Sequence, residues 1–197
     1  MTDTLGHRAI IGVMTPAMNT VVEPELAALR PRGVTNQMQR FRLGGDRVSE
    51  DLSEEAAKLM DCKPSAIAVG LTTDAVVRGV DKLATRCSEL SCELGTPVFN
   101  ASEANHAALR ELGANRIGVV TPFNAEVDAI VRVNTEAAGF DVLAIKRTES
   151  PSLEAICETP LESVRNVFCR VADADVDAIL QVGTALPVVS LIERLEE

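Results

Sequence analysis

The sequence predicts an α/β fold made of two pseudo-symmetric lobes, each a parallel four-stranded sheet flanked by helices. Short apolar strands alternate with helical patterns along the whole chain, which is typical of parallel sheets covered by helices. Two segments also repeat: Ile11–Pro16 reads I-G-V-M-T-P, and Ile117–Pro122 reads I-G-V-V-T-P. Repeats at this separation indicate a duplicated unit of about 105 residues.

A second pair of segments supports the duplication. Ala66–Thr73 reads A-I-A-V-G-L-T-T, and Ala178–Ala185 reads A-I-L-Q-V-G-T-A. The alternative is that any two buried parallel strands look alike, because both are rich in Val and Ile and end near Gly. Under the duplication hypothesis we expect a first lobe over residues 1–113 and a second lobe over residues 114–197.

In the first half, each expected strand is a short apolar run, and each expected helix follows a turn rich in polar residues or Gly. Gly113 comes just after the last helical pattern, where Gly commonly ends a helix. The expected strands are Arg8–Met14, Gln37–Leu43, Ala66–Leu71 and Pro97–Asn100, and the expected helices begin near Thr20 or span Ser49–Cys62, Ala75–Leu94 and Ser102–Leu112.

The second half repeats this alternation, with Gly139 as a helix stop and Arg147–Glu158 as a loop. The pattern then stops about 25 residues before a second copy would be complete, so the second lobe is expected to be incomplete at its C-terminus, by nature or by truncation. The expected strands are Arg116–Val120, Asp141–Lys146 and Ala178–Val182, and the expected helices are Ala125–Ala138, Pro160–Ala172 and one from Pro187.

Composition excludes several classes of protein. The 197 residues carry a net charge of −10 and only 3% aromatic residues, whereas nucleic-acid-binding surfaces are basic and rich in stacking rings. No apolar run is long enough to span a membrane. Five Cys without a signal peptide indicate free thiols in a reducing compartment, so a cytoplasmic location is expected.

The turns that follow the strands are the candidate binding sites, because ligands of parallel α/β sheets bind beyond the carboxyl ends of the strands. Helix N-termini in such turns favour an anion, so a small carboxylate is the expected ligand. Neither nucleotide-binding glycine motif is present, and no residue spacing suggests a metal site. The four turns are Thr15–Thr20, Gly70–Asp74, Thr121–Asn124 and Gly183–Leu186.

A purely structural interpretation of these turns stays open. Thr20 and Glu23 have the spacing of a capping box, and Asp74 could be another N-cap. The two histidines are unpromising as bases, since His7 precedes the first strand and His106 lies within a helical pattern. None of the five cysteines falls in a strand-to-helix turn, and we expect them mainly to fill apolar space.

The same turns carry a resemblance to a known family. The opening I-G-V-M-T-P-A-M-N-T-V-V-E-P-E resembles the start of maleate cis-trans isomerases and arylmalonate decarboxylases, within the aspartate/glutamate/hydantoin racemase superfamily. Thr96–Leu112 followed by R-I-G-V-V-T-P-F-N is similar to the family's join between lobes. The resemblance implies an active site between two lobes, a small carboxylate or dicarboxylate substrate, no cofactor, and a homo-oligomer, a dimer.

The resemblance also implies which positions react. Family catalysis uses a Cys at the end of the third strand of one or both lobes, where a thiolate is a good nucleophile or proton carrier. Those positions fall on Leu71 and Gly183, which can do neither. Asp74 is the ionisable residue beside the site, and it could act as general acid/base if burial raised its pKa.

The residues that would bind substrate are better matched. Asn19 matches the Asn that contacts a substrate carboxylate, and Thr72 and Thr73 match a Thr-Ser pair that cradles one. Phe123 stands where the isomerase and the decarboxylase have Tyr, so a hydroxyl donor is lost. The expected binding set is completed by neighbours in the same turns, namely Thr20, Asn124, Gly183, Thr184 and Ala185.

Two functions follow from this site. The chain could be an enzyme of this superfamily that needs no thiol, with Asp74 or a water moving the proton. It could instead be a non-catalytic carboxylate-binding protein, a sensor or regulatory subunit. A weaker third possibility is that the turns only cap helices and that the chain acts through a protein partner.

Overall fold

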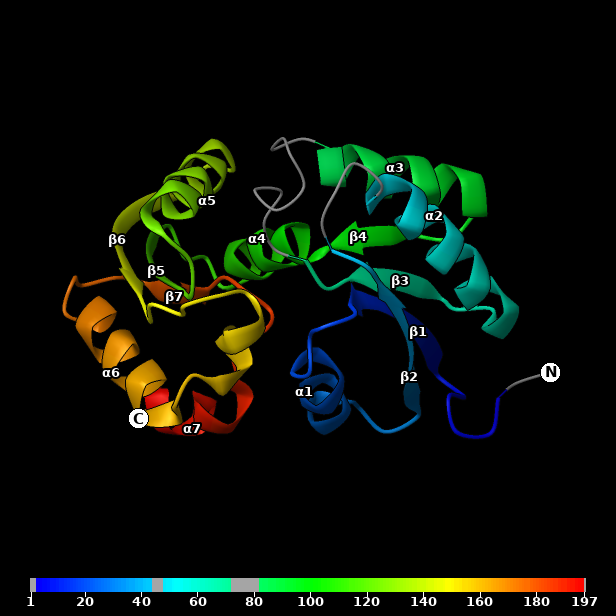
Figure 1. Cartoon of the computed structure of the whole chain (residues 1–197), viewed down its shortest axis with the longest axis horizontal. Coiled ribbons are helices and arrows are strands. Elements are labelled where there is room, and N and C mark those ends of the chain that lie inside the picture. Colours follow the sequence, from blue (N-terminus) through cyan, green and yellow to red (C-terminus); the bar gives the residue numbers. More distant parts are fainter. Residues whose placement is uncertain (1–2, 44–47, 72–81, 197) are drawn as a thin grey trace. The chain divides into compact units, whose positions relative to one another are not determined.

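The computed structural model of the chain describes residues 3–43, 48–71 and 82–196. The chain divides into two compact units, Met1–Glu103 and Ala104–Glu197 (Figure 1). This division falls near the start of a helix, α4 (Ala101–Glu111), whose end is where the sequence placed the boundary. Within the described residues, no helix is long and apolar enough to cross a membrane.

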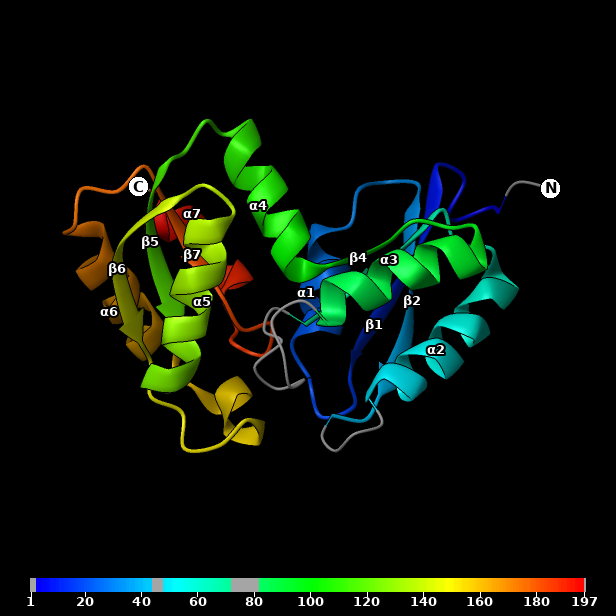
Figure 2. The ribbon, with the colours of Figure 1, turned by 90° about the horizontal axis from the view of Figure 1, so that it is seen from above.

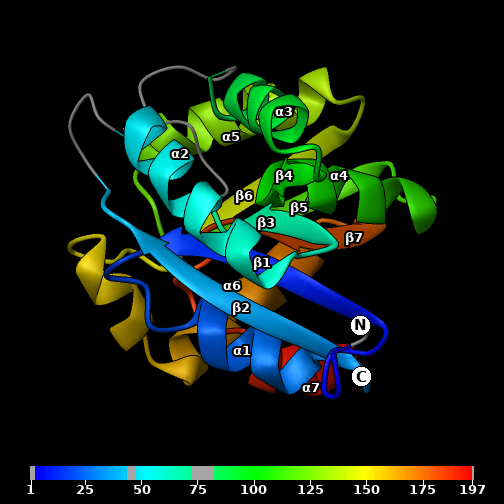
Figure 3. The same ribbon diagram turned by 90° about the vertical axis from the view of Figure 1, so that its right-hand side faces the viewer.

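The first unit is a parallel four-stranded sheet with the strand order β2-β1-β3-β4. Figure 3 shows α1 on one face of this sheet and α2 and α3 on the other, and Figure 2 shows α2 and α3 side by side. The elements are β1 (Ala9–Pro16), α1 (Val22–Leu29), β2 (Val34–Phe41), α2 (Val48–Leu59), a 3₁₀ turn (Met60–Cys62), β3 (Ala66–Val69), α3 (Lys82–Leu94) and β4 (Val98–Asn100).

The second unit repeats the order of the first three strands as β6-β5-β7, and the described residues contain no counterpart of β4. Both sheets are parallel with helices packed on them, which confirms the predicted fold class. The elements after α4 are β5 (Arg116–Thr121), α5 (Ala125–Ala137), β6 (Asp141–Arg147), a 3₁₀ turn (Glu154–Glu158), α6 (Leu161–Ala172), β7 (Ala178–Gln181), a 3₁₀ turn (Val189–Leu191) and α7 (Ile192–Leu195).

The repeated I-G-V segment has one physical explanation in both units. Gly12 and Gly118 lie on the central strands, where a helix or a neighbouring strand comes too close for a side chain. A Cβ on Gly12 would lie 3.1 Å from both Leu59 of α2 and Ile67 of β3, and a Cβ on Gly118 would lie 2.2 Å from Val171 of α6. The glycines therefore permit close packing on each central strand.

Three predicted elements differ from the structure. The strand expected from Gln37 begins three residues earlier, at Val34, because it pairs with β1 from Ala9 onward. The helix expected from Pro187 is a 3₁₀ turn followed by one turn of α-helix. The loop expected over Arg147–Glu158 ends in a 3₁₀ turn. The first part of the helix expected at Ala75–Leu94 lies outside the described residues.

The expectation that cysteines fill apolar space holds for one of them. Cys87 is buried in the core of the first unit. Cys62 and Cys157 are half-buried and Cys92 and Cys169 are exposed, all as free thiols. Cys92 and Cys169 were misplaced because helical periodicity alone does not say which face of a helix meets the sheet. Cys62 and Cys157 lie in 3₁₀ turns at the edge of each unit's helices.

Candidate functional site

The carboxyl end of the central strand carries the same pair of residues in both units. Thr15 is the second-to-last residue of β1 and lies beside Arg40 of β2, and Thr121 ends β5 beside Arg147 of β6, each pair in direct strand register. An Asn follows each Thr within four residues, and its side chain accepts hydrogen bonds from backbone N–H groups at the start of the next helix. The internal repeat therefore extends to the polar side chains at the strand ends, and this supports a duplicated unit.

In the first unit, Asn19 organises the turn after β1. Its side-chain Oδ1 accepts hydrogen bonds from the backbone N–H groups of Val21 and Val22, at 2.9 and 3.0 Å. Its backbone carbonyl accepts a bond of 2.7 Å from Arg40. Asn19 is almost fully buried, so the predicted binding residue holds the start of α1 in place.

The capping box predicted from Thr20 and Glu23 does not form. Thr20 is exposed, and the Glu23 carboxylate pairs with the Arg40 guanidinium at 2.7 Å. The buried Asn19 side chain takes the place of Thr20, because its Oδ1 already accepts from the N–H groups at the start of α1. A reciprocal box of the same type forms instead at α4, where Asn100 and Glu103 bond to each other's backbone N–H groups at 2.9 and 3.0 Å.

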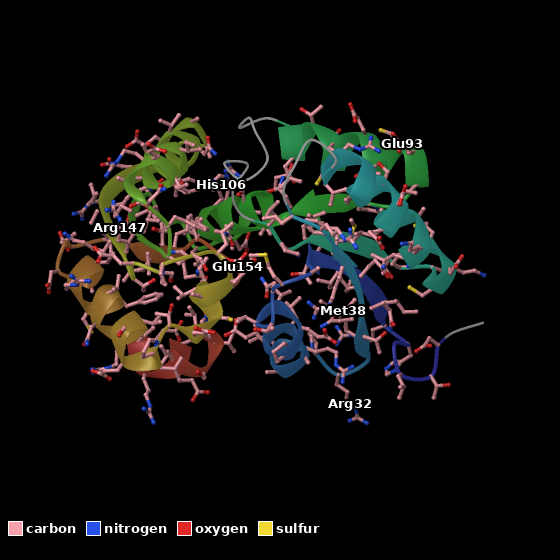
Figure 4. The ribbon with its side chains drawn as sticks, in the orientation of Figure 1. Arg32, Met38, Glu93, His106, Arg147 and Glu154 are labelled. Carbon is pink, nitrogen blue, oxygen red and sulfur yellow. The ribbon has the colours of Figure 1, made fainter. Side chains whose placement is uncertain are left out.

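The second unit builds the equivalent turn around an ion pair whose carboxylate is buried. Asn124 caps α5 by accepting from the Val127 N–H at 3.0 Å. The Asp128 carboxylate accepts a 2.6 Å bond from the Thr121 hydroxyl, and it accepts two bonds from the Arg147 Nε and Nη2 at 2.9 and 2.6 Å. Thr121 and Asp128 are both buried. Figure 4 labels Arg147 in the second unit.

Thr15 has no counterpart of the Thr121 bond. Its hydroxyl is buried and has no hydrogen-bond partner within the described part of the chain. It lies close to the end of β3, since a Cβ on Gly70 would be 3.7 Å from it. A buried hydroxyl without a partner costs free energy, and a ligand oxygen at the strand ends would remove that cost.

Leu71, at the first position that the resemblance marks as reactive, is part of a hydrophobic core. It follows β3 and is 6% exposed, and it belongs to a cluster that includes Met14, Phe41 and Val69. A leucine here is held by apolar packing, and it presents no reactive group to a substrate.

Gly183, at the second such position, has no room for a side chain. Its φ of +115° is one that residues with a Cβ rarely adopt, and a Cβ would lie 2.7 Å from the Pro122 ring and 3.2 Å from Phe123. Its carbonyl accepts from Leu186 N–H at 3.0 Å and from the Gln181 side chain at 2.8 Å. The turn after β7 therefore depends on glycine.

The remaining predicted binding residues of the second unit lie around this turn. Phe123 packs half-buried against both hydrophobic clusters of the unit. Thr184 and Ala185 are the central residues of the turn that Gly183 and Leu186 close, and both are partly exposed, whereas Asn124 is exposed and occupied as a cap. The structure thus brings Phe123 and Gly183 together.

Thr72, Thr73 and Asp74 lie within 72–81, outside the described residues, so their predicted roles stay predictions. Within the described ranges, no group of three or more His, Cys, Asp or Glu side chains is placed to hold a metal ion. His106 lies in α4, half-buried against the ring of Phe140, which precedes β6, at 5.6 Å between centroids. Burial lowers the pKa of His106, and the Arg110 charge lowers it further.

Comparison with known proteins gives the family. The model of the arylmalonate decarboxylase family matches residues 11–197. The chain belongs to the arylmalonate decarboxylase family. Maleate isomerase from Geobacillus stearothermophilus is 23% identical over 95% of this chain and 82% of that relative. These relatives are enzymes, and this agrees with the enzyme interpretation of the sequence.

Solved structures of family relatives share the fold over nearly the whole chain. A cysteine-to-alanine variant of maleate isomerase from Pseudomonas putida S16, with maleate, matches with a TM-score of 0.84 and 21% identity, covering 95% of this chain and 82% of that one. A cysteine-to-serine variant of the Nocardia farcinica maleate cis-trans isomerase, with a covalently bound succinylcysteine intermediate, matches with 0.85 and 22%, covering 95% and 83%. Arylmalonate decarboxylase matches with 0.76 and 21%, covering 95% and 84%.

Sequence reasoning missed the side chains that organise the strand ends. Arg40 and Asp128 were predicted only as parts of a strand and a helix, Arg147 as the start of a loop, and Thr15 and Thr121 only as members of turns. A usable signal was available, because each Thr-Pro is followed by an Asn and then, four residues after that Asn, by an acid: Glu23 in one half and Asp128 in the other. The arginines could not be found in the same way, since their pairing depends on strand register.

Proposed function

We propose that the chain is a cofactor-independent enzyme of the isomerase or decarboxylase type that acts on a small carboxylate or dicarboxylate. Family membership supports the reaction class, and the names of its relatives, maleate isomerase and arylmalonate decarboxylase, support the substrate class. By the same resemblance we propose a homodimer in the cytoplasm. The observation that carries the proposal is the buried, unpartnered Thr15 hydroxyl at the carboxyl end of β1.

A carboxylate is the ligand that this strand end would favour. Its oxygens accept hydrogen bonds, and the Thr15 hydroxyl can donate one. The start of α1, which Asn19 holds, adds the positive end of the helix dipole on the same side of the sheet. We propose that Thr72 and Thr73 complete the cradle.

The proposed chemistry avoids a thiol. Leu71 and Gly183 cannot add to a double bond, so isomerisation through a covalent cysteine adduct is not available at these positions. Decarboxylation needs a bound carboxylate, a neighbouring group on the substrate that stabilises the electron pair left behind, such as a second carboxyl group, and a proton source. The bond to the leaving carboxyl breaks, carbon dioxide departs, and the electron pair stays on the adjacent carbon, where Asp74 or a water delivers a proton.

One observation favours a second candidate, a non-catalytic carboxylate-binding protein. Leu71 is buried in the core and Gly183 has no space for a Cβ. The surroundings of both positions are therefore adapted to residues that cannot react with a substrate. A protein that retains the cradle and lacks a reactive group would bind the same ligands without turnover.

Ligand binding is tested by a thermal-shift screen against maleate, malonates, aspartate, glutamate and hydantoins. We expect a carboxylate to raise the melting temperature, and we expect Thr15→Val, Asn19→Ala and Thr72→Ala each to reduce that shift. Thr35→Val is the matched control, because the Thr35 hydroxyl is also buried without a partner in the described residues but lies near the start of β2. Equal loss of the shift in Thr15→Val and Thr35→Val would exclude Thr15 as a ligand contact.

Turnover separates the two candidates. NMR spectroscopy of each stabilising ligand incubated with the protein should show a decarboxylated or isomerised product, and Asp74→Asn should abolish its formation. Binding without any product would favour the non-catalytic candidate. Unchanged turnover in Asp74→Asn would remove Asp74 from the mechanism.

A further inference from the structure

A groove of about 530 Å³ opens on the second unit, between the end of β6 and one face of α6. Cavities that hold small molecules typically measure about 300–1,000 Å³, so its size suits a metabolite. The side chains that matter are Lys146, Arg147 and Thr148 from β6 and the residue after it, and Ser163, Asn166 and Arg170 from α6. The three residues of α6 share one face because they are three and four positions apart.

The groove gathers positive charge on a chain whose net charge is −10. Lys146 and Arg170 are exposed, and neither has an ion pair within the described residues. Glu149 is the acidic residue on the rim. Cations that share a groove repel one another, so a bound anion would stabilise this arrangement.

Arg147 is held in place before any ligand arrives. Its Nε and Nη2 donate to the Asp128 carboxylate at 2.9 and 2.6 Å, and this carboxylate also accepts from the Thr121 hydroxyl. Two bonds to one carboxylate fix the plane of the guanidinium. Its Nη1, which makes no hydrogen bond within the described residues, therefore loses little conformational freedom on binding a ligand.

Thr148 gives independent evidence that the groove binds a ligand, because its hydroxyl lacks a hydrogen-bond partner. Its backbone N–H donates to the Thr121 carbonyl at 3.0 Å, so the residue is fixed in position. Its side-chain hydroxyl is buried, borders the groove, and has no hydrogen-bond partner within the described chain. A ligand oxygen in the groove would supply that partner.

We propose that this groove binds a small molecule through a doubly charged oxyanion, a phosphate group. A phosphate has several acceptor oxygens around one centre, so it can meet the Lys146 and Arg170 charges together with the Ser163 hydroxyl and the Asn166 amide. The apolar floor of Ile145 and Val167 would lie against the carbon part of a phosphate ester. The inference does not depend on the carboxylate site of the proposed function.

Isothermal titration calorimetry of the full chain tests the proposal, with inorganic phosphate and glycerol phosphate as separate probes. We expect one site per chain, with binding about tenfold weaker in Arg170→Gln and in Lys146→Gln. Tighter binding of glycerol phosphate than of phosphate would identify an ester as the ligand class, and the reverse order would identify the free ion. Thr148→Val should also weaken binding, with its fold checked by circular dichroism.

Arg165→Gln is the matched control, since Arg165 lies on α6, is exposed, and is not part of the groove. It removes the same charge from the same helix and should leave the affinity unchanged. If Arg165→Gln and Arg170→Gln weakened phosphate binding equally, the affinity would depend only on the total charge of α6 and not on the groove. That result would overturn the proposal. Absence of binding by both phosphate probes, or preference for succinate over both, would also overturn it.

Discussion

Single residues decide what the strand-end turns can accept. Gly183 combines a φ of +115° with a Pro122 ring 2.7 Å from where a Cβ would be. Leu71, the corresponding position of the first unit, is large and buried. The two positions thus differ in opposite ways: the Leu71 side chain fills apolar space, and Gly183 has no space for a side chain.

The constraint at Gly183 predicts a large effect of adding one methyl group. Gly183→Ala should lower the free energy of unfolding by about 2–4 kcal/mol, because it adds steric overlap to an unfavourable φ. Gly139→Ala is the control: its φ is +98° but nothing lies within 4 Å of its Cβ position, so a loss of about 1 kcal/mol is expected. Urea unfolding of both variants measures the difference, and equal losses would contradict the steric argument.

The Thr, Asn, acid and Arg residues at the strand ends of both units predict that removing the acid's charge lowers the free energy of unfolding by different amounts in the two units. Asp128 is buried and holds both Thr121 and Arg147, so Asp128→Asn should lower the free energy of unfolding by about 2 kcal/mol. Glu23 is exposed, and Glu23→Gln should cost less than about 1 kcal/mol. Chemical denaturation of the two variants gives the comparison, and a greater loss in Glu23→Gln would contradict it.

At the scale of elements, α4 is fixed at both ends by features of different kinds. Asn100 and Glu103 bond reciprocally at its start, and Gly113, with a φ of +68°, follows its end. On its side, His106 packs on Phe140 at the end of the turn that precedes β6, and Arg110 lies over the same ring at 5.6 Å. The helix therefore carries a titratable group inside a hydrophobic contact.

This contact predicts a pH dependence of stability. Burial lowers the pKa of His106 below its ordinary value of 6.5, so below that pH the unfolded chain binds more protons than the folded chain. The contribution of the neutral His106 to the free energy of unfolding is therefore fully present above about pH 6.5, and it is lost as the pH falls through the folded-state pKa. The melting temperature should therefore fall less between about pH 7.5 and pH 5 in His106→Gln than in the unchanged protein.

The other histidine provides the control. His7 is exposed before β1, and His7→Gln should leave the pH profile of the melting temperature as it is. If His106→Gln and the unchanged protein lose the same stability over this range, the buried imidazole does not cause the dependence.

The order of elements was predictable, because strand–helix alternation and helix-stopping glycines act through neighbours in sequence. The start of β2 and the shape of the C-terminal segment were not, because they depend on pairing with β1 and on packing against α6. At the site, Asn19 and Asn124 could be predicted as turn residues. Their side-chain bonds are local, since they reach N–H groups two or three residues ahead. The Arg40–Asn19 and Arg147–Asp128 contacts arise only when strand pairing brings together residues 21 and 19 positions apart.

At the scale of the whole molecule, the two units follow one plan with different interiors. Each has a central strand flanked by two others in the same order, with a helix packed closely at an equivalent glycine. The first sheet has a fourth strand, β4, which extends it beyond β3. The prediction of pseudo-symmetric lobes thus holds for topology, while side chains at equivalent positions differ in their burial and in their contacts.

The duplicated arginine pairs differ most in their access to water, and this has a consequence for ionic strength. In the Arg40–Glu23 pair the side chains are 37% and 52% exposed, whereas Asp128 in the second pair is 7% exposed. Counter-ions screen exposed charges strongly and buried charges weakly. Added salt should therefore weaken the link between β2 and α1 while leaving that between β6 and α5 nearly intact, so the equivalent contact is salt-sensitive in the first unit and salt-tolerant in the second.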